Sequence, residues 1–439
     1  MASNARDLAV TALVRWEREQ TYSNVMLDAL LQSAALPAAE AAFTTQLVYG
    51  VMERMLTIDW LLEKNSRQPI KKCHPTVRAV LRVAVYQIVY LDKIPASAAV
   101  NEAVKQVKVM KQPYAAGYVN GLLRAVSEAA PRLLASLPQD LKGHSLRYSI
   151  PLALLQAWDR AYGRETAVAL AKASDEDAPT VVRVNTLKTT VESFCEQLKG
   201  ASIAFCPIDG LPAALIVEDA AALRAIPALS DHYYVQDAAS QWALQALAPQ
   251  PHEEVLDMCA APGGKSFTAA MHMEGQGRIV SCDLYDEKVK TMAARAKRYG
   301  IDCMQTVCRD ASSPLPVEWE GRFDRVICDV PCSGFGVIRR RPEIRYKSLM
   351  SFAELPALQY TILCEAAKAV KAGGVLQYST CTLRPEENEE VTARFLNAHP
   401  SFLPRPLSIA HASQTHELTL MPHLHQTDGF YVASFRKEG

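Results

Sequence analysis

The C-terminal half of the chain alternates short apolar runs with helical patterns, and this alternation constrains the fold more than any other feature. A helical pattern at 287–299 separates two of these runs and is ended by Gly300. Apolar strands joined by helices predict βαβ units, with a parallel sheet covered by helices on both faces. Five runs have the length of strands, namely 255–258, 278–282, 304–308, 323–328 and 374–378.

The first run leads into a glycine-rich turn, at the edge of the sheet where open α/β folds bind their ligands. The turn resembles the end of a phosphate-binding P-loop, but Cys259 stands where that motif requires a glycine. No G-x-G-x-x-G is present either, so phosphate binding is disfavoured. The remaining interpretation is a tight turn that approaches a nucleoside with its backbone. It consists of Cys259, Ala260, Ala261, Pro262, Gly263, Gly264 and Lys265.

Aspartates follow the next three runs. Asp283 lies about 20 residues beyond the turn, a spacing at which a carboxylate accepts hydrogen bonds from the ribose hydroxyls of a bound nucleoside. Asp310 follows the third run and is expected near an exocyclic amine such as that of adenine, and Asp329 ends the fourth. Each aspartate taken alone could equally be a helix N-cap. Their succession favours a ligand site.

Two cysteines complete this set, since Cys332 follows Asp329 and Cys381 follows the fifth run. Adjacent parallel strands lie about 5 Å apart, so the two thiols would face one ligand if the fourth and fifth strands are neighbours. The 11 cysteines form no C-x-x-C pair, and Cys328 and Cys332 lack a second ligand pair, so no metal site is expected. Two cysteines without a metal suggest covalent chemistry or a redox pair.

The rest of the chain divides by its patterns. We predict an all-helical domain at 1–130, a linker at 131–150, a small α+β domain at 151–232 and the α/β domain at 233–439. No apolar run reaches the length of a membrane span, and the start lacks the apolar core of a signal peptide. The expectation is therefore a cytoplasmic protein that does not contact a membrane, with reduced cysteines.

Charge is balanced overall, with 47 basic and 47 acidic residues, but it is distributed unevenly. Residues 64–112 contain ten Lys or Arg and two acidic residues, and the loop 336–347 contains five and one. A solvated face is the alternative to RNA binding for the first stretch. The loop follows the Cys332 motif directly, which favours phosphate contacts beside the site. A further cluster opens a helix, where acidic side chains favour the dipole: Glu386, Glu387, Glu389 and Glu390.

Three motifs resemble the signatures of the RNA 5-methylcytosine methyltransferases. They read DMCAAPGGKS at 257–266, DVPCSG at 329–334 and STCT at 379–382, with lesser motifs at 183–188, 235–241, 339–345 and 428–433. Val330 stands where the family usually has alanine, and Ser266 where threonine is common. The helical part is similar to the NusB family of RNA-binding domains, at 5–10, 47–54 and 85–105.

The resemblance implies a Rossmann-like methyltransferase domain that uses S-adenosylmethionine, preceded by an all-α NusB-like domain and a small α+β linking domain. It implies that Cys381 attacks carbon 6 of cytosine and that Cys332 helps to remove the proton at carbon 5. Asp329 would contact the N3/N4 edge of the base. The cofactor would lie on the turn at 259–265 and near Asp329, with Asp283 on its ribose and Asp310 near its adenine. Lys265 is expected either to lower the pKa of a thiol or to contact the ligand.

The fusion with a NusB-like domain implies, again by resemblance, a monomeric bacterial methyltransferase of small-subunit (16S) ribosomal RNA. The cytosine must be exposed to be attacked on its face, so a loop or a flipped base is the expected target. Two alternatives stay open on the sequence: another RNA target (transfer RNA or large-subunit ribosomal RNA), and a non-catalytic RNA-binding assembly factor.

Overall fold

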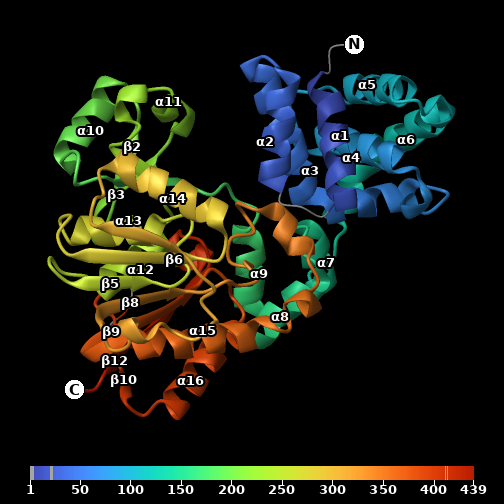
Figure 1. The fold of residues 1–439 in the computed structure, drawn as a ribbon. Coiled ribbons are helices and arrows are strands. Elements are labelled where there is room, and N and C mark those ends of the chain that lie inside the picture. The colour runs from blue at the N-terminus through green and yellow to red at the C-terminus, as the bar shows by residue number, and fades with distance from the viewer. Residues whose placement is uncertain (1–3, 20–22, 411, 413) are drawn as a thin grey trace. The chain divides into compact units, whose positions relative to one another are not determined.

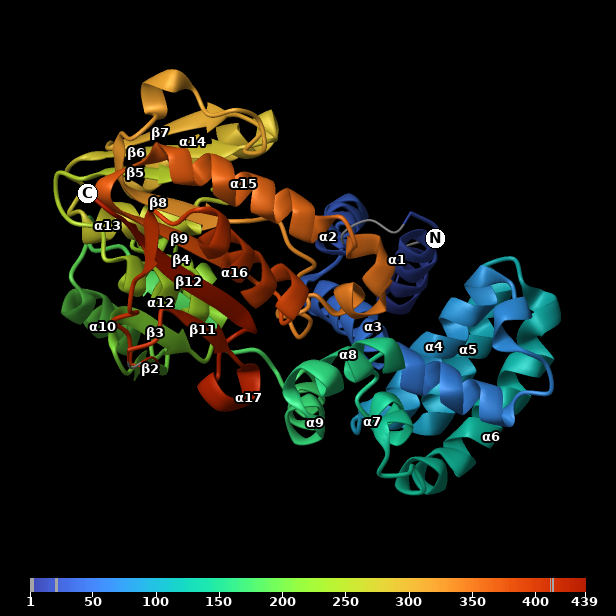
Figure 2. The ribbon, with the colours of Figure 1, turned by 90° about the horizontal axis from the view of Figure 1, so that it is seen from below.

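The computed structural model describes residues 4–19, 23–410, 412 and 414–439. Residues 1–3, at the start of the segment that lacks the apolar core of a signal peptide, lie outside the described residues. The chain forms two compact units (Figures 1 and 2). One consists of Met1–Glu176 and Ile338–Lys347, and the other of Asp177–Val337 and Ser348–Gly439.

The first unit is helical, which confirms the all-α expectation for the N-terminal part. Its helices are α1 (Ala5–Glu19), α2 (Ser23–Ala34), α3 (Ala38–Asn65), α4 (Pro75–Tyr90), α5 (Ala96–Val109), α6 (Ala116–Ala135), α7 (Leu141–Arg147), α8 (Leu152–Tyr162) and α9 (Arg164–Ala173). The apolar stripe of α4 packs into one core with α1, α3, α5 and α6. Residues 131–150, expected to form an irregular linker, hold the end of α6 and all of α7, which begins where Asp140 caps it.

The second unit begins with a small antiparallel sheet of order β2-β3-β1-β4. Its strands are β1 (Thr180–Val184), β2 (Phe205–Ile208), β3 (Leu211–Val217) and β4 (Tyr233–Val235), with helices α10 (Val191–Gly200) and α11 (Ala220–Arg224). Strands and helices therefore both occur in this part of the chain, as expected of an α+β domain.

The larger sheet has the order β10-β12-β9-β8-β5-β6-β7. All five predicted strands form as β5 (Glu254–Asp257), β6 (Arg278–Asp283), β7 (Met304–Cys308), β8 (Phe323–Asp329) and β9 (Val370–Thr380), and they pair in parallel. An antiparallel edge that the periodicity did not predict follows. It consists of β10 (Phe402–Pro404), β11 (Glu417–Leu420) and β12 (Phe430–Lys437).

Helices cover both faces of this sheet, as predicted. Alternate residues of β5 enter different cores: Val255 packs with α12–α14, and Leu256 packs with α15 and α16. The helices are α12 (Ala238–Leu247), α13 (Gly264–His272), α14 (Asp286–Tyr299), α15 (Leu355–Ala369), α16 (Glu389–Ala398) and α17 (Pro422–His425). In the described part of the chain, no helix has the length and apolar character needed to cross a membrane.

Candidate active site

The cysteine pair lies where β8 and β9 end side by side. Asp329 on β8 is in register with Ser379 on β9, so the loops that follow the two strands leave the sheet together. The Sγ atoms of Cys332 and Cys381 lie 3.2 Å apart, and both thiols are free. The expectation that neighbouring strands bring these two thiols together is confirmed.

Close backbone contacts hold the two loops. Gly336 donates its N–H to the carbonyl of Cys381 at 3.0 Å and accepts from the N–H of Gly429 at 2.8 Å. The hydroxyls of Ser333 and Thr382 are 2.8 Å apart. A Cβ added at Gly336 would lie 1.9 Å from the carbonyl oxygen of Gly429. Only glycine fits here, because backbone occupies the space that a side chain needs.

Gly336→Ala is therefore expected to displace the Cys381 loop and to lower the rate of the catalysed reaction by about 100-fold, the cost of a misplacement of about 1 Å. Gly200→Ala is the matched control, because a Cβ at Gly200 meets nothing within 4 Å. Initial rates at saturating substrate, with melting temperatures for both variants, test this. A rate for Gly336→Ala equal to that of the control contradicts the role of this contact.

The carboxylate of Asp329 is held from two sides. Lys265 Nζ lies 2.6 Å from Asp329 Oδ2, and the Ser379 hydroxyl donates to Oδ1 at 2.7 Å. Lys265 also donates to the Ser240 hydroxyl at 3.1 Å and lies over the ring of Phe430. Neither of the two roles expected for Lys265 includes this ion pair with Asp329, and no bond from Lys265 to a thiol is present among the described residues.

The thiol of Cys332 holds its proton firmly. Its hydrogen bond with Cys381 and its burial, in that order, raise its pKa well above the ordinary value, and the charge of Glu387 adds to the effect. Cys332 is therefore a neutral thiol at neutral pH, placed to donate to the sulfur of Cys381.

The glycine-rich turn connects β5 to α13. Gly263 has φ 105°, a conformation that favours glycine, and Ala260 donates to the Cys282 carbonyl on β6 at 2.7 Å. Asp283, at the end of β6, accepts from the N–H of Ala261 at 3.3 Å and from that of Tyr285 at 3.1 Å. The structure thus brings Asp283 against the turn, as its spacing predicted.

Asp310 lies one strand further along the edge and is exposed. The Ser312 side chain and backbone donate to its Oδ1 at 2.6 and 2.8 Å, and these bonds lower the pKa of Asp310. Its described contacts are local, and none joins it to the turn.

Sequence reasoning missed Asp257, the last residue of β5. Burial raises its pKa to about 7, against the opposing effect of a hydrogen bond from Ser266 at 2.7 Å. Its Oδ1 is buried and has no hydrogen-bond partner in the part of the chain that the structure describes. The only signal for this residue in the sequence was its place at the start of the turn motif.

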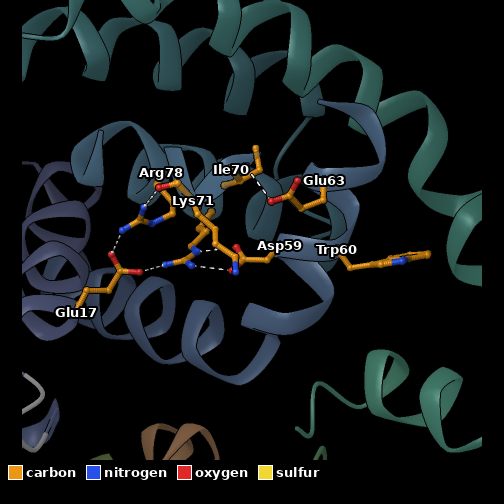
Figure 3. A pocket seen from close by; sticks show the side chains of 8 residues that line it. Glu17, Asp59, Trp60, Glu63, Ile70, Lys71 and Arg78 are labelled. Carbon is orange, nitrogen blue, oxygen red and sulfur yellow. Dashed lines mark hydrogen bonds and ion pairs between the residues drawn. The ribbon is translucent and has the colours of Figure 1, made fainter. Parts of the chain in front are cut away.

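The basic stretch at 64–112 is partly neutralised within the fold (Figure 3). Arg82, whose spacing on α4 places it beside the apolar stripe, is nevertheless buried and binds both oxygens of Asp59 at 2.7 Å. It also pairs with Glu17, which Arg78 binds at 2.8 Å. These side chains line a cavity with Glu63 and Lys71. Arg78 and Arg82 therefore stabilise the helical unit, and the remaining eight Lys and Arg of the stretch are all exposed.

The expectation for the basic loop at 336–347 is wrong for Arg345. Ile338–Lys347 belongs to the helical unit, where Arg345 is 1% exposed and donates to the carbonyls of Glu53, Ser174 and Ile338 at 3.0–3.3 Å. Tyr346 donates beside it to the Met52 carbonyl at 2.6 Å. Arg345 satisfies backbone carbonyls and is not exposed to a phosphate.

The dipole interpretation of the acidic cluster also fails for Glu387. This residue is 0% exposed and precedes α16, in a 3-10 turn at Pro385–Glu387. Its carboxylate bonds to the loop of Cys332. A helix dipole stabilises acidic side chains that remain exposed to solvent, so it does not explain why Glu387 is buried.

A parallel sheet with a glycine-rich turn after β5, an aspartate after β6 and two facing cysteines after β8 and β9 defines a Rossmann-like methyltransferase that uses S-adenosylmethionine. Family models agree: "16S rRNA methyltransferase RsmB/F" matches residues 244–436, the NusB family 3–128, and the ferredoxin-like domain of RsmF/B-like methyltransferases 150–224. The chain belongs to the RsmB/F family of methyltransferases.

Individual relatives match over the whole length. A probable ribosomal RNA small subunit methyltransferase B from Bacillus subtilis is 34% identical and covers 100% of this chain and 99% of that protein. The one from Synechocystis is also 34% identical, over 99% of both. Among solved structures, the crystal structure of PH0851 is similar with a TM-score of 0.83 and 26% identity, covering 100% of both chains.

Proposed function

We propose that this protein transfers a methyl group from S-adenosylmethionine to carbon 5 of a cytosine in 16S ribosomal RNA. The observation that carries the proposal is the pair of thiols 3.2 Å apart, beside Asp329. The relatives indicate which RNA is the substrate, because they are named as methyltransferases of small-subunit ribosomal RNA and match at least 99% of this chain.

Cys381 acts as the nucleophile. Carbon 5 of cytosine is weakly nucleophilic, and addition of the Cys381 thiolate to carbon 6 makes carbon 5 enamine-like. Asp329 faces the N3/N4 edge of the base and, in its protonated form, gives its proton to N3, where negative charge develops as the thiolate adds; N3 returns this proton when Cys381 leaves. Lys265 and Ser379 fix the Asp329 carboxylate for this task.

Cys332 acts after methyl transfer. Once the Cys381 sulfur is bonded to carbon 6 it is a neutral thioether, so the main cause of the raised pKa of Cys332 is removed. Cys332 then releases its proton to water and takes the proton from carbon 5. The bond between carbon 6 and sulfur breaks, and Cys381 leaves as a thiolate. One proton is released in each turnover.

The residues of the turn fit S-adenosylmethionine, which supplies the methyl group from its sulfonium. Residues 259–265 would hold the cofactor with their backbone, and Asp283, which lies against this turn, would accept from its ribose hydroxyls. Asp310 would be near the adenine, and Asp329 would border the methyl group. Asp257, whose buried Oδ1 has no hydrogen-bond partner among the described residues, ends the strand that leads into this turn. In the described part of the chain, no three His, Cys, Asp or Glu side chains cluster as metal ligands.

The NusB-like domain binds the ribosomal RNA in this proposal. Support comes from the family match and from the cations of 64–112 that the fold leaves exposed: Lys64, Arg67, Lys71, Lys72, Lys93, Lys105, Lys108 and Lys111. Apart from Arg345, the basic residues of the loop at 336–347 are also proposed to contact RNA. We also propose that the protein acts as a monomer. It is proposed to act in the cytoplasm, because its substrate, ribosomal RNA, is found there.

The protein is expected to place one 5-methylcytosine in 16S ribosomal RNA from a strain that lacks this enzyme. Tritiated methyl transfer, followed by base-resolution mapping, measures it, with 23S ribosomal RNA and transfer RNA as matched substrates. Methylation of one of those RNAs instead overturns the 16S assignment. Binding of RNA without binding of S-adenosylmethionine in calorimetry favours a non-catalytic assembly factor.

A further inference from the structure

Glu387 has a buried carboxylate that plays no role in the proposed reaction steps. Of the acidic cluster, Glu386 and Glu390 are exposed, whereas Glu387 is fully buried. Removing a carboxylate from water is unfavourable unless hydrogen bonds and charge compensate it. The partners of Glu387 therefore indicate what its burial serves.

Those partners divide between its two oxygens. Oε1 accepts from Arg384 Nη1 at 3.1 Å, an ion pair within its own turn. Oε2 accepts from the backbone N–H of Ser333 at 2.9 Å and from the amide of Gln359 at 3.0 Å. The ion pair is local and accounts for Oε1 alone, while Oε2 bonds to the residue directly after Cys332.

Gln359, on α15, completes the arrangement. It is 0% exposed, and its Nε2 donates both to Glu387 and, at 2.9 Å, to the carbonyl of Pro331. Both neighbours are acceptors, so the amide nitrogen must face them. Its Oε1 is left without a hydrogen-bond partner among the described residues. A buried oxygen without a hydrogen bond is unfavourable, so the two hydrogen bonds donated by Nε2 must compensate for it.

Together the two side chains hold the peptide groups on both sides of Cys332, the carbonyl before it and the N–H after it. The Cys381 loop has further supports besides its bond with Ser333: Gly336 donates to the Cys381 carbonyl, and Asn388 donates to the Thr382 carbonyl at 3.0 Å. Loss of Glu387 or Gln359 should therefore displace Cys332 more than Cys381.

We propose that Glu387 and Gln359 are positioning residues that hold Cys332 for removal of the proton from carbon 5, and so control release of the methylated RNA. This inference rests on the proposed function of the same site. The two residues touch neither substrate nor cofactor and act through the backbone on either side of Cys332.

The test uses Glu387→Gln and Gln359→Met in the full-length protein. In Glu387→Gln, an amide N–H must face a donor, either Arg384 or the pair formed by Ser333 and Gln359; Gln359→Met removes both bonds at similar volume. The kcat on ordinary 16S ribosomal RNA is expected to fall about 10- to 100-fold with kcat/KM unchanged, because a slower step after methyl transfer lowers kcat and KM together and lets the covalent protein–RNA adduct accumulate. Glu389→Gln is the matched control, since Glu389 accepts from Thr419 and has no bond to the Cys332 loop among the described residues.

A second substrate isolates the earlier steps. RNA transcribed with 5-fluorocytidine has fluorine at carbon 5, so no proton can be removed and the adduct persists. Both variants are expected to trap this RNA at the wild-type rate. Slower trapping, lower turnover without adduct, or equal adduct in Glu389→Gln overturns the inference. The proposed function fails separately, if the wild-type protein neither methylates nor traps 16S ribosomal RNA.

Discussion

Replacing Cys381 with alanine is expected to abolish methyl transfer. Without the thiolate, carbon 6 receives no nucleophile and carbon 5 stays unreactive toward the methyl donor. Loss of a catalytic nucleophile lowers kcat by about 10⁴- to 10⁶-fold, which places the variant at the detection limit of a tritium assay. Trapping of 5-fluorocytidine RNA should also vanish, because the adduct bond is made by Cys381.

Folding should survive this substitution, because Cys381 is held by its backbone. The bond that fixes it is donated by Gly336 to its carbonyl, which alanine keeps. Binding of S-adenosylmethionine and the melting temperature should therefore match the wild type. Cys206→Ala, at an exposed cysteine of β2, is the matched control and should be fully active. Methyl transfer by Cys381→Ala at a tenth of the wild-type rate or more would show that the nucleophile is another group.

Local periodicity was sufficient to predict most of the catalytic sheet. Strands buried on both faces consist of nearly continuous apolar residues, which is why the run at 278–282 falls within β6, where five of the six residues are buried. Gly300 ends α14 in the left-handed conformation for which glycine was expected. The site residues followed from the same logic, because neighbouring parallel strands end at one edge.

Interactions distant in sequence escaped this reasoning. Arg82 lies off the apolar stripe by its spacing, and only Asp59 on α3 and Glu17 on α1 explain its burial. The sequence places Arg345 in a basic loop. In the structure this segment belongs to the helical unit, where Arg345 donates to the Glu53 carbonyl. Composition counts charges and cannot tell which of them the fold neutralises. Strand β12 pairs antiparallel with β9, an arrangement that no local pattern at 428–433 specifies.

Replacing Cys332 with alanine is expected to leave attack and methyl transfer intact while blocking release. The carbon 5 proton then lacks its base, so the bond between Cys381 and carbon 6 persists after methylation. A positioned acid–base group contributes about 10²- to 10⁴-fold, and turnover should fall by that amount. The first turnover should remain visible as a protein–RNA band on a denaturing gel, containing one methyl group for each protein.

The adduct must depend on Cys381 if the two thiols have the assigned roles. A Cys332→Ala, Cys381→Ala double variant should show neither band nor methyl transfer, whereas Cys332→Ala with Cys206→Ala should behave like Cys332→Ala alone. The hydrogen bond between the two thiols is the main cause of the raised pKa of Cys332. Replacing Cys332 with alanine therefore also removes a hydrogen-bond donor from the Cys381 sulfur. For that reason adduct formation in the single variant is expected to be no faster than in the wild type, whereas release is expected to be slower. Normal turnover without an accumulated adduct would assign proton removal to water or to another side chain.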